Sequence, residues 1–317
     1  MTTMELLDRR LLFVTGKGGV GKTTVSAALA LVAAAQGKRT LVCEVDAKGS
    51  VASLLECGPV GFAPTEAAPG VSVMAMDTED SLKEYLSLQL RVPLIARIGP
   101  LAKTFDFVAT AAPGVKEILT VGKLCWEVRE RNWDLVVVDA PASGHVIGQL
   151  AAAESINELV KVGRVRDQTR WMIDILADPA TTGAVIVSAP EEMPVTETVE
   201  LAGRIRAETQ VDLAAVVVNR VLPELFGRGE EEVFDSLSVP DNAARLVEAV
   251  GGPVGPVLDA ARLAVTLRRT RAGHLERLQA ELGGVAPLLF VPYLFTRSFG
   301  MRATRTVADA LSDELGY

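Results

Sequence analysis

The sequence predicts an α/β protein with a doubly wound, mostly parallel sheet of about seven to eight strands and helices on both faces. Continuous apolar runs rich in valine and leucine recur along the chain, separated by segments with helical periodicity. Runs without polar alternation are typical of strands buried on both faces, as in parallel sheets. The first run leads into a glycine-rich turn and then an alanine-rich segment, the order of a strand, a phosphate-binding loop and a helix.

Seven segments are predicted to be strands: 11–15, 39–45, 71–76, 135–139, 184–188, 214–219 and 288–291. The alanine- and leucine-rich segment 23–36 is predicted to be a helix that ends at Gly37, a residue suited to the left-handed turn after a helix. Segments 82–90 and 164–176 place apolar residues at helical spacing and are also predicted to be helices. Region 223–256 is acidic and rich in turn residues, so we expect an exposed loop there, either an insertion or a mobile flap.

The composition describes a globular protein with a large core. Of the 317 residues, 49% are hydrophobic and 23% are charged, which excludes a disordered chain. We expect residues 1–317 to form a single domain, because α/β folds of this length often do. No apolar run reaches the roughly 18 to 20 residues that a membrane-spanning helix needs. We therefore expect no transmembrane segment.

Charge and cysteine content narrow the expected location and partners. Residues 1–10 lack the basic segment, apolar run and cleavage site of a signal peptide, so a cytoplasmic location is expected. The three cysteines form no C-x-x-C pair, which suits a reducing compartment and argues against a disulfide framework or structural zinc. The net charge of −8 disfavours nonspecific binding of nucleic acid, because such binding depends on a basic surface.

The glycine-rich turn after the first predicted strand carries the strongest functional signal. The P-loop pattern G-x-x-x-x-G-K-[ST] is matched by Gly16, Gly21, Lys22 and Thr23. Such a turn directs backbone N–H groups and the positive end of a helix dipole at one point, which suits a phosphate. We expect Lys22 to reach the β- and γ-phosphates and the Thr23 hydroxyl to bind Mg²⁺. The expected cofactors are ATP and Mg²⁺, and the expected nucleotide-binding residues of the loop are Gly16, Gly18, Gly19, Val20, Gly21, Lys22, Thr23 and Thr24.

Two acids follow predicted strands, at the edge of the sheet where ligands bind in folds of this type. Asp139 ends an apolar run of four residues, so we expect it to be a metal ligand together with Thr23. Asp46 follows the second predicted strand, and two roles stay open for it. It either orients the water that attacks the γ-phosphate or caps a helix that begins near Ser50.

The motif K-G-G-V-G-K-T-T at residues 17–24 resembles the deviant Walker A motif of the class that contains MinD, ParA, the nitrogenase iron protein and the arsenite-pump ATPases. In that class the first lysine, here Lys17, reaches the phosphates of the partner subunit. The resemblance therefore implies a dimer that closes over nucleotide, either a homodimer or a heterodimer with a related ATPase. The catalytic residues it implies are Lys17, Lys22 and Asp46.

The motif D-A-P-A-S-G-H at residues 139–145 resembles the second switch, D-T-A-P-T-G-H, of the arsenite-pump and tail-anchored-protein-targeting ATPases. Pro141 stands one position earlier than the proline of that family pattern. The resemblance implies the switch residues Asp46, Asp139, Ser143, Gly144 and His145. It also implies adenine contacts from Asn219, Pro292 and Tyr293, and an amide offers both a donor and an acceptor to the edge of a base.

The sequence is thus identified as a short bacterial member of this ArsA-like, anion-transporting family. The expected function is Mg-dependent ATP hydrolysis that drives a nucleotide-gated dimer switch and handles a protein client or a membrane-associated partner. Helical regions at 78–130 and 150–180 lie where the family binds its clients. Two alternatives stay open: an ATP-binding regulatory module with little hydrolysis, and a MinD- or ParA-like positioning ATPase. The cysteines lack the converging spacing that arsenite binding needs.

Overall fold

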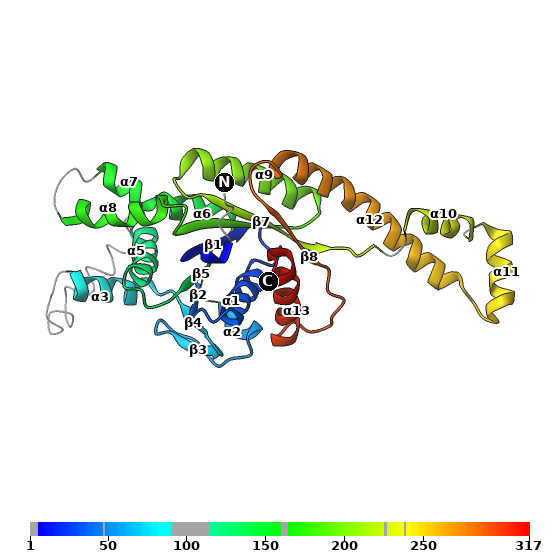
Figure 1. The fold of residues 1–317 in the computed structure, drawn as a ribbon, viewed down its shortest axis with the longest axis horizontal. Coiled ribbons are helices and arrows are strands. Elements are labelled where there is room, and N and C mark those ends of the chain that lie inside the picture. Colours follow the sequence, from blue (N-terminus) through cyan, green and yellow to red (C-terminus); the bar gives the residue numbers. More distant parts are fainter. Residues whose placement is uncertain (1–5, 47, 90–113, 160–163, 225–226, 238) are drawn as a thin grey trace.

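The computed structural model describes residues 6–46, 48–89, 114–159, 164–224, 227–237 and 239–317. Within these residues one sheet of eight strands runs through the body of the molecule (Figure 1). Its strands are β1 (Leu11–Gly16), β2 (Thr40–Glu44), β3 (Thr65–Ala68), β4 (Val71–Ala75), β5 (Leu135–Asp139), β6 (Thr182–Ser188), β7 (Leu213–Val221) and β8 (Leu288–Pro292). Their order is β3-β4-β2-β5-β1-β6-β7-β8, and only the β3–β4 pair is antiparallel.

Helices cover both faces of this sheet, which confirms the predicted doubly wound α/β fold (Figure 1). The helices are α1 (Lys22–Ala35), α2 (Ser50–Leu54), α3 (Thr78–Gln89), α5 (Val115–Arg129), α6 (Ser143–Leu150), α7 (Ala152–Leu159), α8 (Arg164–Ala177), α9 (Glu192–Glu208), α10 (Arg228–Leu237), α11 (Pro240–Val250), α12 (Gly255–Leu282) and α13 (Met301–Leu315), preceded by a short 3₁₀ helix, Leu6–Asp8. Alternation along β1 separates the two cores. Leu12 and Val14 pack with α1, α2 and α13, whereas Leu11 and Phe13 pack with α5, α6, α8 and α9.

All seven predicted strands are present, and the predicted helices at 82–90 and 164–176 correspond to α3 and α8, residue 90 lying outside the described part. The sequence analysis missed β3, which pairs with β4 at the edge of the sheet. Its first residues, Thr65 and Glu66, are exposed. A short edge strand with polar, exposed residues lacks the continuous apolar run by which the central strands were recognised.

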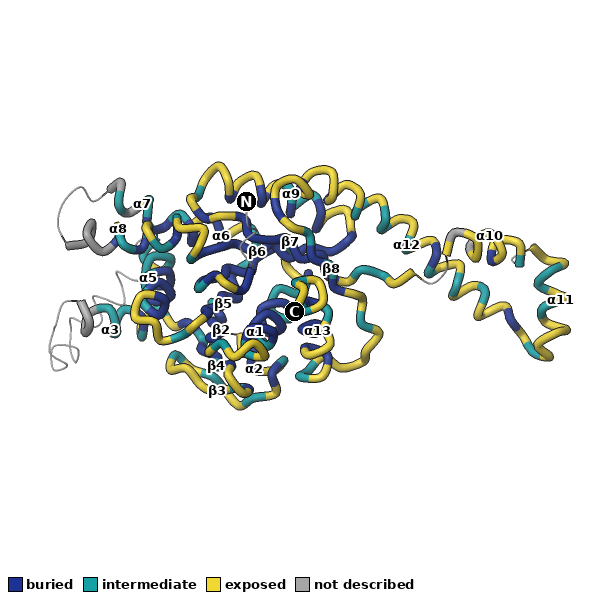
Figure 2. The backbone as a smooth tube through the Cα atoms, viewed as in Figure 1, coloured by how far each residue is buried: buried dark blue, intermediate teal, exposed yellow. Residues whose placement is uncertain are grey.

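The prediction of an exposed loop over 223–256 is wrong. Most of this region is helical, as α10 and α11 lie within it and α12 begins at Gly255. Its turn residues mark helix boundaries: Pro240 is the first residue of α11, where a missing N–H has no cost, and Gly251 ends α11 in a left-handed conformation. Helices α10 and α11 and the first half of α12 form an arm that projects from the sheet, and most of its surface is exposed (Figure 2).

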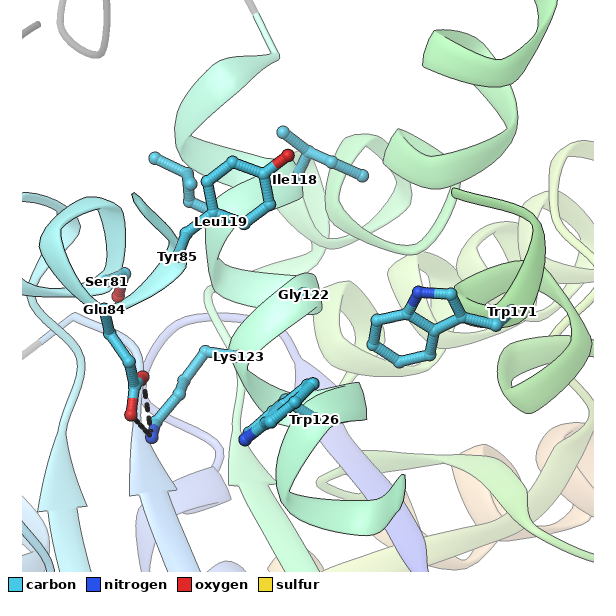
Figure 3. A pocket seen from close by; sticks show the side chains of 9 residues that line it. All are labelled: Ser81, Glu84, Tyr85, Ile118, Leu119, Gly122, Lys123, Trp126 and Trp171. Carbon is cyan, nitrogen blue, oxygen red and sulfur yellow. Dashed lines mark hydrogen bonds and ion pairs between the residues drawn. The ribbon is translucent and has the colours of Figure 1, made fainter. Parts of the chain in front are cut away.

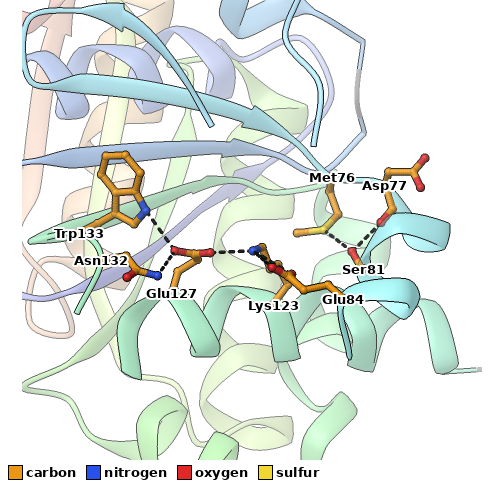
Figure 4. Close-up of polar contacts among 8 residues, drawn as sticks. All are labelled: Met76, Asp77, Ser81, Glu84, Lys123, Glu127, Asn132 and Trp133. Atoms are coloured by element: carbon orange, nitrogen blue, oxygen red, sulfur yellow. Dashed lines mark hydrogen bonds and ion pairs between the residues drawn. The ribbon is translucent and has the colours of Figure 1, made fainter. Parts of the chain in front are cut away.

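A layer of helices formed by α3, α5, α7 and α8 lies at the end of the molecule opposite the arm (Figure 1). A buried charge network joins its helices: the Lys123 ammonium on α5 donates hydrogen bonds to Glu84 on α3, at 2.8 Å, and to Glu127, at 2.7 Å (Figure 4). Glu127 also accepts hydrogen bonds from Asn132 and Trp133. Burial lowers the pKa of Lys123, but these two carboxylates more than offset it, so the pKa lies above its usual value.

No helix in the described ranges is both long enough and apolar enough to cross a membrane.

We predict that Lys123→Met lowers the free energy of unfolding by about 3–5 kcal/mol, because it leaves the buried Glu127 carboxylate without its cation. Urea unfolding followed by circular dichroism measures the change. The matched control is Lys83→Met on α3, whose ion pairs with Glu79 and Asp80 are exposed and whose loss should cost about 0.5 kcal/mol or less. Equal losses for the two variants would show that the buried network does not stabilise the helical layer.

Candidate functional site

The phosphate loop connects β1 to α1, and close packing requires glycine at two of its positions. A Cβ at Gly16, where φ is 144°, would lie 2.2 Å from the carbonyl oxygen of Val187 on β6. A Cβ at Gly21, where φ is 99°, would lie 2.4 Å from the side-chain nitrogen of Asn219 on β7. Gly21 precedes α1, and no side chain caps this helix. The N-terminus of α1 and its dipole are therefore open to an anion.

Lys22 is the first residue of α1 and bends back over the loop. Its ammonium donates a hydrogen bond to the backbone carbonyl oxygen of Lys17 at 3.2 Å. Burial lowers the pKa of Lys22, while the charges of Asp139 and Asp46 act to raise it. Lys22, the predicted phosphate-binding lysine, is thus close enough to Asp139 and Asp46 to interact electrostatically with both.

Asp139 lies at the carboxyl end of β5 and contacts two hydroxyl groups of α1. The Thr23 hydroxyl donates a hydrogen bond to one carboxylate oxygen at 2.8 Å, and the Ser26 hydroxyl lies 3.2 Å from the other. Burial raises the pKa of Asp139 to about 6, although these two hydrogen bonds act to lower it. A buried carboxylate beside a threonine hydroxyl is a set of hard oxygen donors, which fits Mg²⁺. Thr23 and Asp139 would hold this ion.

Asp46 follows β2 and is half exposed, with the Lys48 ammonium 3.5 Å from its carboxylate. The helix that begins at Ser50 is capped by Glu44 instead, because the Glu44 carboxylate accepts hydrogen bonds from the N–H groups of Gly49 and Ser50 at 3.1 and 2.9 Å. Of the two roles considered for Asp46, capping is therefore performed by another residue. The sequence analysis gave Glu44 no role, and its position within a strand carries no cap signal.

The second switch motif runs from Asp139 into α6. The Thr15 hydroxyl on β1 donates a hydrogen bond to the carbonyl oxygen of Pro141 at 3.0 Å, which ties the start of the motif to the sheet. Ser143 begins α6 and is partly buried, whereas Gly144 and His145 are exposed. The structure thus leaves the Ser143 side chain partly covered at the start of α6 and His145 facing solvent.

Lys17 points toward α9 in this chain. Its ammonium forms an ion pair with Glu197 at 2.6 Å, and the Ser143 hydroxyl donates a hydrogen bond to the other oxygen of the same carboxylate at 3.3 Å. Sequence reasoning missed Glu197, because a single acid on an amphipathic helix 180 residues from Lys17 carries no motif.

A cavity of about 330 Å³ opens beside the phosphate loop and brings the predicted adenine residues together. Its lining includes Gly21 and Thr24 of the loop region and all three predicted contacts, Asn219, Pro292 and Tyr293. Charged residues that the sequence analysis did not select also line it, namely Glu191, Arg220 and Arg271.

Asn219 has a second relation to the phosphate loop. Its side-chain N–H₂ donates a hydrogen bond to the carbonyl oxygen of Val20 at 2.8 Å, and its side-chain oxygen accepts one from the N–H of Arg220 at 2.9 Å. Asn219 therefore holds the loop from β7, two strands away from β1 in the sheet. Its contact with a base stays a prediction.

The described residues contain no cluster of three or more histidine, cysteine or acidic side chains that could hold a metal ion. Cys43 and Cys125 are buried, and burial raises the pKa of both thiols. Cys57 is partly buried, and all three are free thiols. Protonated, buried thiols are poor ligands for a soft ion.

Together, the strand, the glycine-rich loop, the helix and the contact between Thr23 and Asp139 define a P-loop protein. The sequence profile of the family described as anion-transporting ATPase matches residues 9–172 and 154–228, more than half of the chain. The chain therefore belongs to the anion-transporting ATPase family, a family of ATP-hydrolysing enzymes.

Curated relatives agree with this assignment. The chain is 32% identical over 225 residues to ATPase BagA of Mycobacterium tuberculosis, a match that covers 68% of this chain and 66% of the relative, just under two thirds of its length. It is 26% identical over 247 residues to a putative arsenical pump-driving ATPase of Aquifex aeolicus, covering 68% and 81%. It is also 24% identical over 342 residues to Protein Rv2184c of Mycobacterium tuberculosis, covering 95% and 74%.

The raised pKa of Asp139 predicts how the metal-free protein responds to pH. The folded protein binds the proton of Asp139 more tightly than the unfolded chain does. The resulting contribution to the free energy of unfolding is complete below the ordinary pKa of 3.8 and is lost as the pH rises through about 6. Between pH 4 and 7.5, wild type should lose about 1–3 kcal/mol more than Asp139→Asn.

Urea unfolding in the presence of a chelator measures this difference. The comparison with Asp139→Asn cancels the titration of the other carboxylates. Identical pH dependence in the two proteins would mean that burial does not hold the Asp139 carboxylate in its acid form.

Proposed function

We propose that this chain binds Mg·ATP at the phosphate loop and hydrolyses it. The observation that carries the proposal is the 2.8 Å contact between the Thr23 hydroxyl and the Asp139 carboxylate, beside the loop that carries Lys22. The loop N–H groups and the Lys22 ammonium would bind the β- and γ-phosphates. When bound, Mg²⁺ neutralises charge on those phosphate oxygens. Ser26, on the turn of α1 after Thr23, keeps the Asp139 carboxylate oriented toward the site.

Asp46 is proposed to orient and deprotonate the attacking water. It follows the carboxyl end of β2, and the phosphate loop follows the carboxyl end of β1, so both lie at the same edge of the parallel strands. Its only hydrogen-bond partner given by the described residues is the exposed Lys48 at 3.5 Å, which leaves carboxylate oxygens available to a water molecule. Ser143, Gly144 and His145 are proposed to respond to the γ-phosphate from the start of α6.

We further propose that the working unit is a dimer, either of this chain or with a related ATPase. Lys17 would stabilise the transferring phosphoryl group of the sister chain, as the deviant Walker A motif suggests. The base would occupy the 330 Å³ cavity between Asn219 and the end of β8, where Pro292 and Tyr293 lie. Closing and opening of the dimer with nucleotide state would then transmit hydrolysis to a partner.

The client or partner is proposed to bind the helical layer, in regions 78–130 and 150–180, of which 90–113 and 160–163 lie outside the described residues. A cavity of about 80 Å³ between α3, α5 and α8 supports this proposal (Figure 3). Its walls include Tyr85, Trp126 and Trp171, and Gly122 also lines it. Aromatic walls of this size suit one apolar side chain or a small apolar group.

Asp46→Asn tests hydrolysis separately from binding, because it removes the carboxylate charge and keeps the size of the side chain. We expect hydrolysis to fall by about 10²–10⁴-fold and ATP affinity to change by about threefold or less. Single-turnover phosphate release and equilibrium binding of a fluorescent ATP analogue measure the two quantities.

The matched control is Glu66→Gln, an equivalent loss of charge on the exposed edge strand β3. Undiminished hydrolysis by Asp46→Asn would remove Asp46 from the mechanism. Wild-type protein that binds ATP and releases no phosphate, with or without a partner extract, would favour the regulatory module over the enzyme.

A further inference from the structure

One carboxylate connects the phosphate loop to the second switch. Glu197 pairs through one oxygen with the Lys17 ammonium at 2.6 Å, and its other oxygen accepts a hydrogen bond from the Ser143 hydroxyl at 3.3 Å. The three residues come from three elements: the loop after β1, the first turn of α6, and α9. No other residue in the described part of the chain forms an ion pair with Lys17.

The position of Glu197 is set by a helix that is well anchored to the sheet. On the turns beside Glu197, Val195 and Leu201 are buried in the core. The buried Thr198 hydroxyl donates a hydrogen bond to the Ser188 hydroxyl at the end of β6, at 2.9 Å. From the other side, Arg277 of α12 donates a hydrogen bond to the Thr196 hydroxyl at 3.0 Å. Glu197 therefore lies on a helix that is anchored on both sides. Because the lysine side chain is longer than that of glutamate, Lys17 is the partner that moves.

The pair is about two thirds buried, with exposed side-chain fractions of 28% for Lys17 and 31% for Glu197. Because the two side chains are partly buried, water and salt screen the attraction between the Lys17 ammonium and the Glu197 carboxylate less than they would on the open surface. The ion pair neutralises the charge of Lys17. An ammonium held 2.6 Å from the Glu197 carboxylate of the same chain is not available to the phosphates of another chain. The two positions of Lys17 exclude each other.

We propose that Glu197 is a positioning residue that holds Lys17 in the separate chain and releases it when two chains close over nucleotide. This proposal rests on the proposed function, in which Lys17 acts on the sister chain. The hydrogen bond from Ser143 makes the ion pair between Glu197 and Lys17 sensitive to bound nucleotide. Ser143 lies four residues after Asp139, so a movement of the switch toward a γ-phosphate removes one of the two contacts of the Glu197 carboxylate.

The ion pair itself is tested by the reactivity of the Lys17 amine. Glu197→Gln keeps the size of the side chain and its ability to accept a hydrogen bond from Ser143, but it removes the charge. Pulse labelling of amines with an acetylating reagent, read by mass spectrometry of the full-length protein without nucleotide, should modify Lys17 about threefold to tenfold faster in the variant. The control is Glu200→Gln, an exposed position on the same helix. An unchanged rate at Lys17 would overturn the proposal.

The consequence for assembly is tested by ATP-dependent self-association, measured by sedimentation in the Asp46→Asn background so that nucleotide is not consumed. Glu197→Gln should lower the concentration at half-association about threefold to tenfold, and this gain should disappear when Lys17 is also changed to Met. Unchanged or weaker association, or a gain that persists without Lys17, would overturn it. If wild-type protein does not self-associate in the presence of ATP, the proposed dimer is contradicted. The labelling rates would still decide whether Glu197 holds Lys17.

Discussion

The contact between the Thr23 hydroxyl and the Asp139 carboxylate is the centre of the candidate nucleotide site. It joins the first turn of α1 to the central strand β5, whose neighbours are β1 and β2. Burial raises the pKa of Asp139 to about 6, so the fold places this carboxylate in an environment that disfavours its charge. A bound cation would stabilise such a buried carboxylate, because it replaces the favourable interaction with water that burial removes. This environment is consistent with the proposed binding of Mg·ATP at the site.

Around this contact the single chain assembles almost every group that phosphoryl transfer needs. Lys22 lies over the loop, Asp46 is exposed at the neighbouring strand end, and Asn219 holds the loop from β7. The exception is the second cation, because Lys17 is turned toward Glu197 on α9. Under the proposed function, a single chain would bind nucleotide but lack one positive charge at the γ-phosphate. The proposed dimer would supply this charge from a second chain.

The fold and the loop could be predicted from the sequence because both depend on local signals. Valine-rich runs identify buried parallel strands, and the spacing of Gly16, Gly21 and Lys22 identifies the phosphate loop. The edge strand β3 and the helices α10 and α11 were not predicted, since their polar and turn-forming residues resemble those of loops. Glu44 and Glu197 were missed for a different reason. Their roles depend on partners that the folded chain brings together, which no short pattern records.

The central claim, a phosphate site completed by a second chain, is tested most directly by mixing two inactive variants. A Lys17→Ala chain keeps its own loop lysine, and a Lys22→Ala chain keeps the lysine it would donate. If Lys17 acts on the sister chain, an equal mixture should recover about a quarter of wild-type ATPase activity, because half of the dimers are mixed and each has one complete site. A mixture no more active than either variant alone would contradict the account.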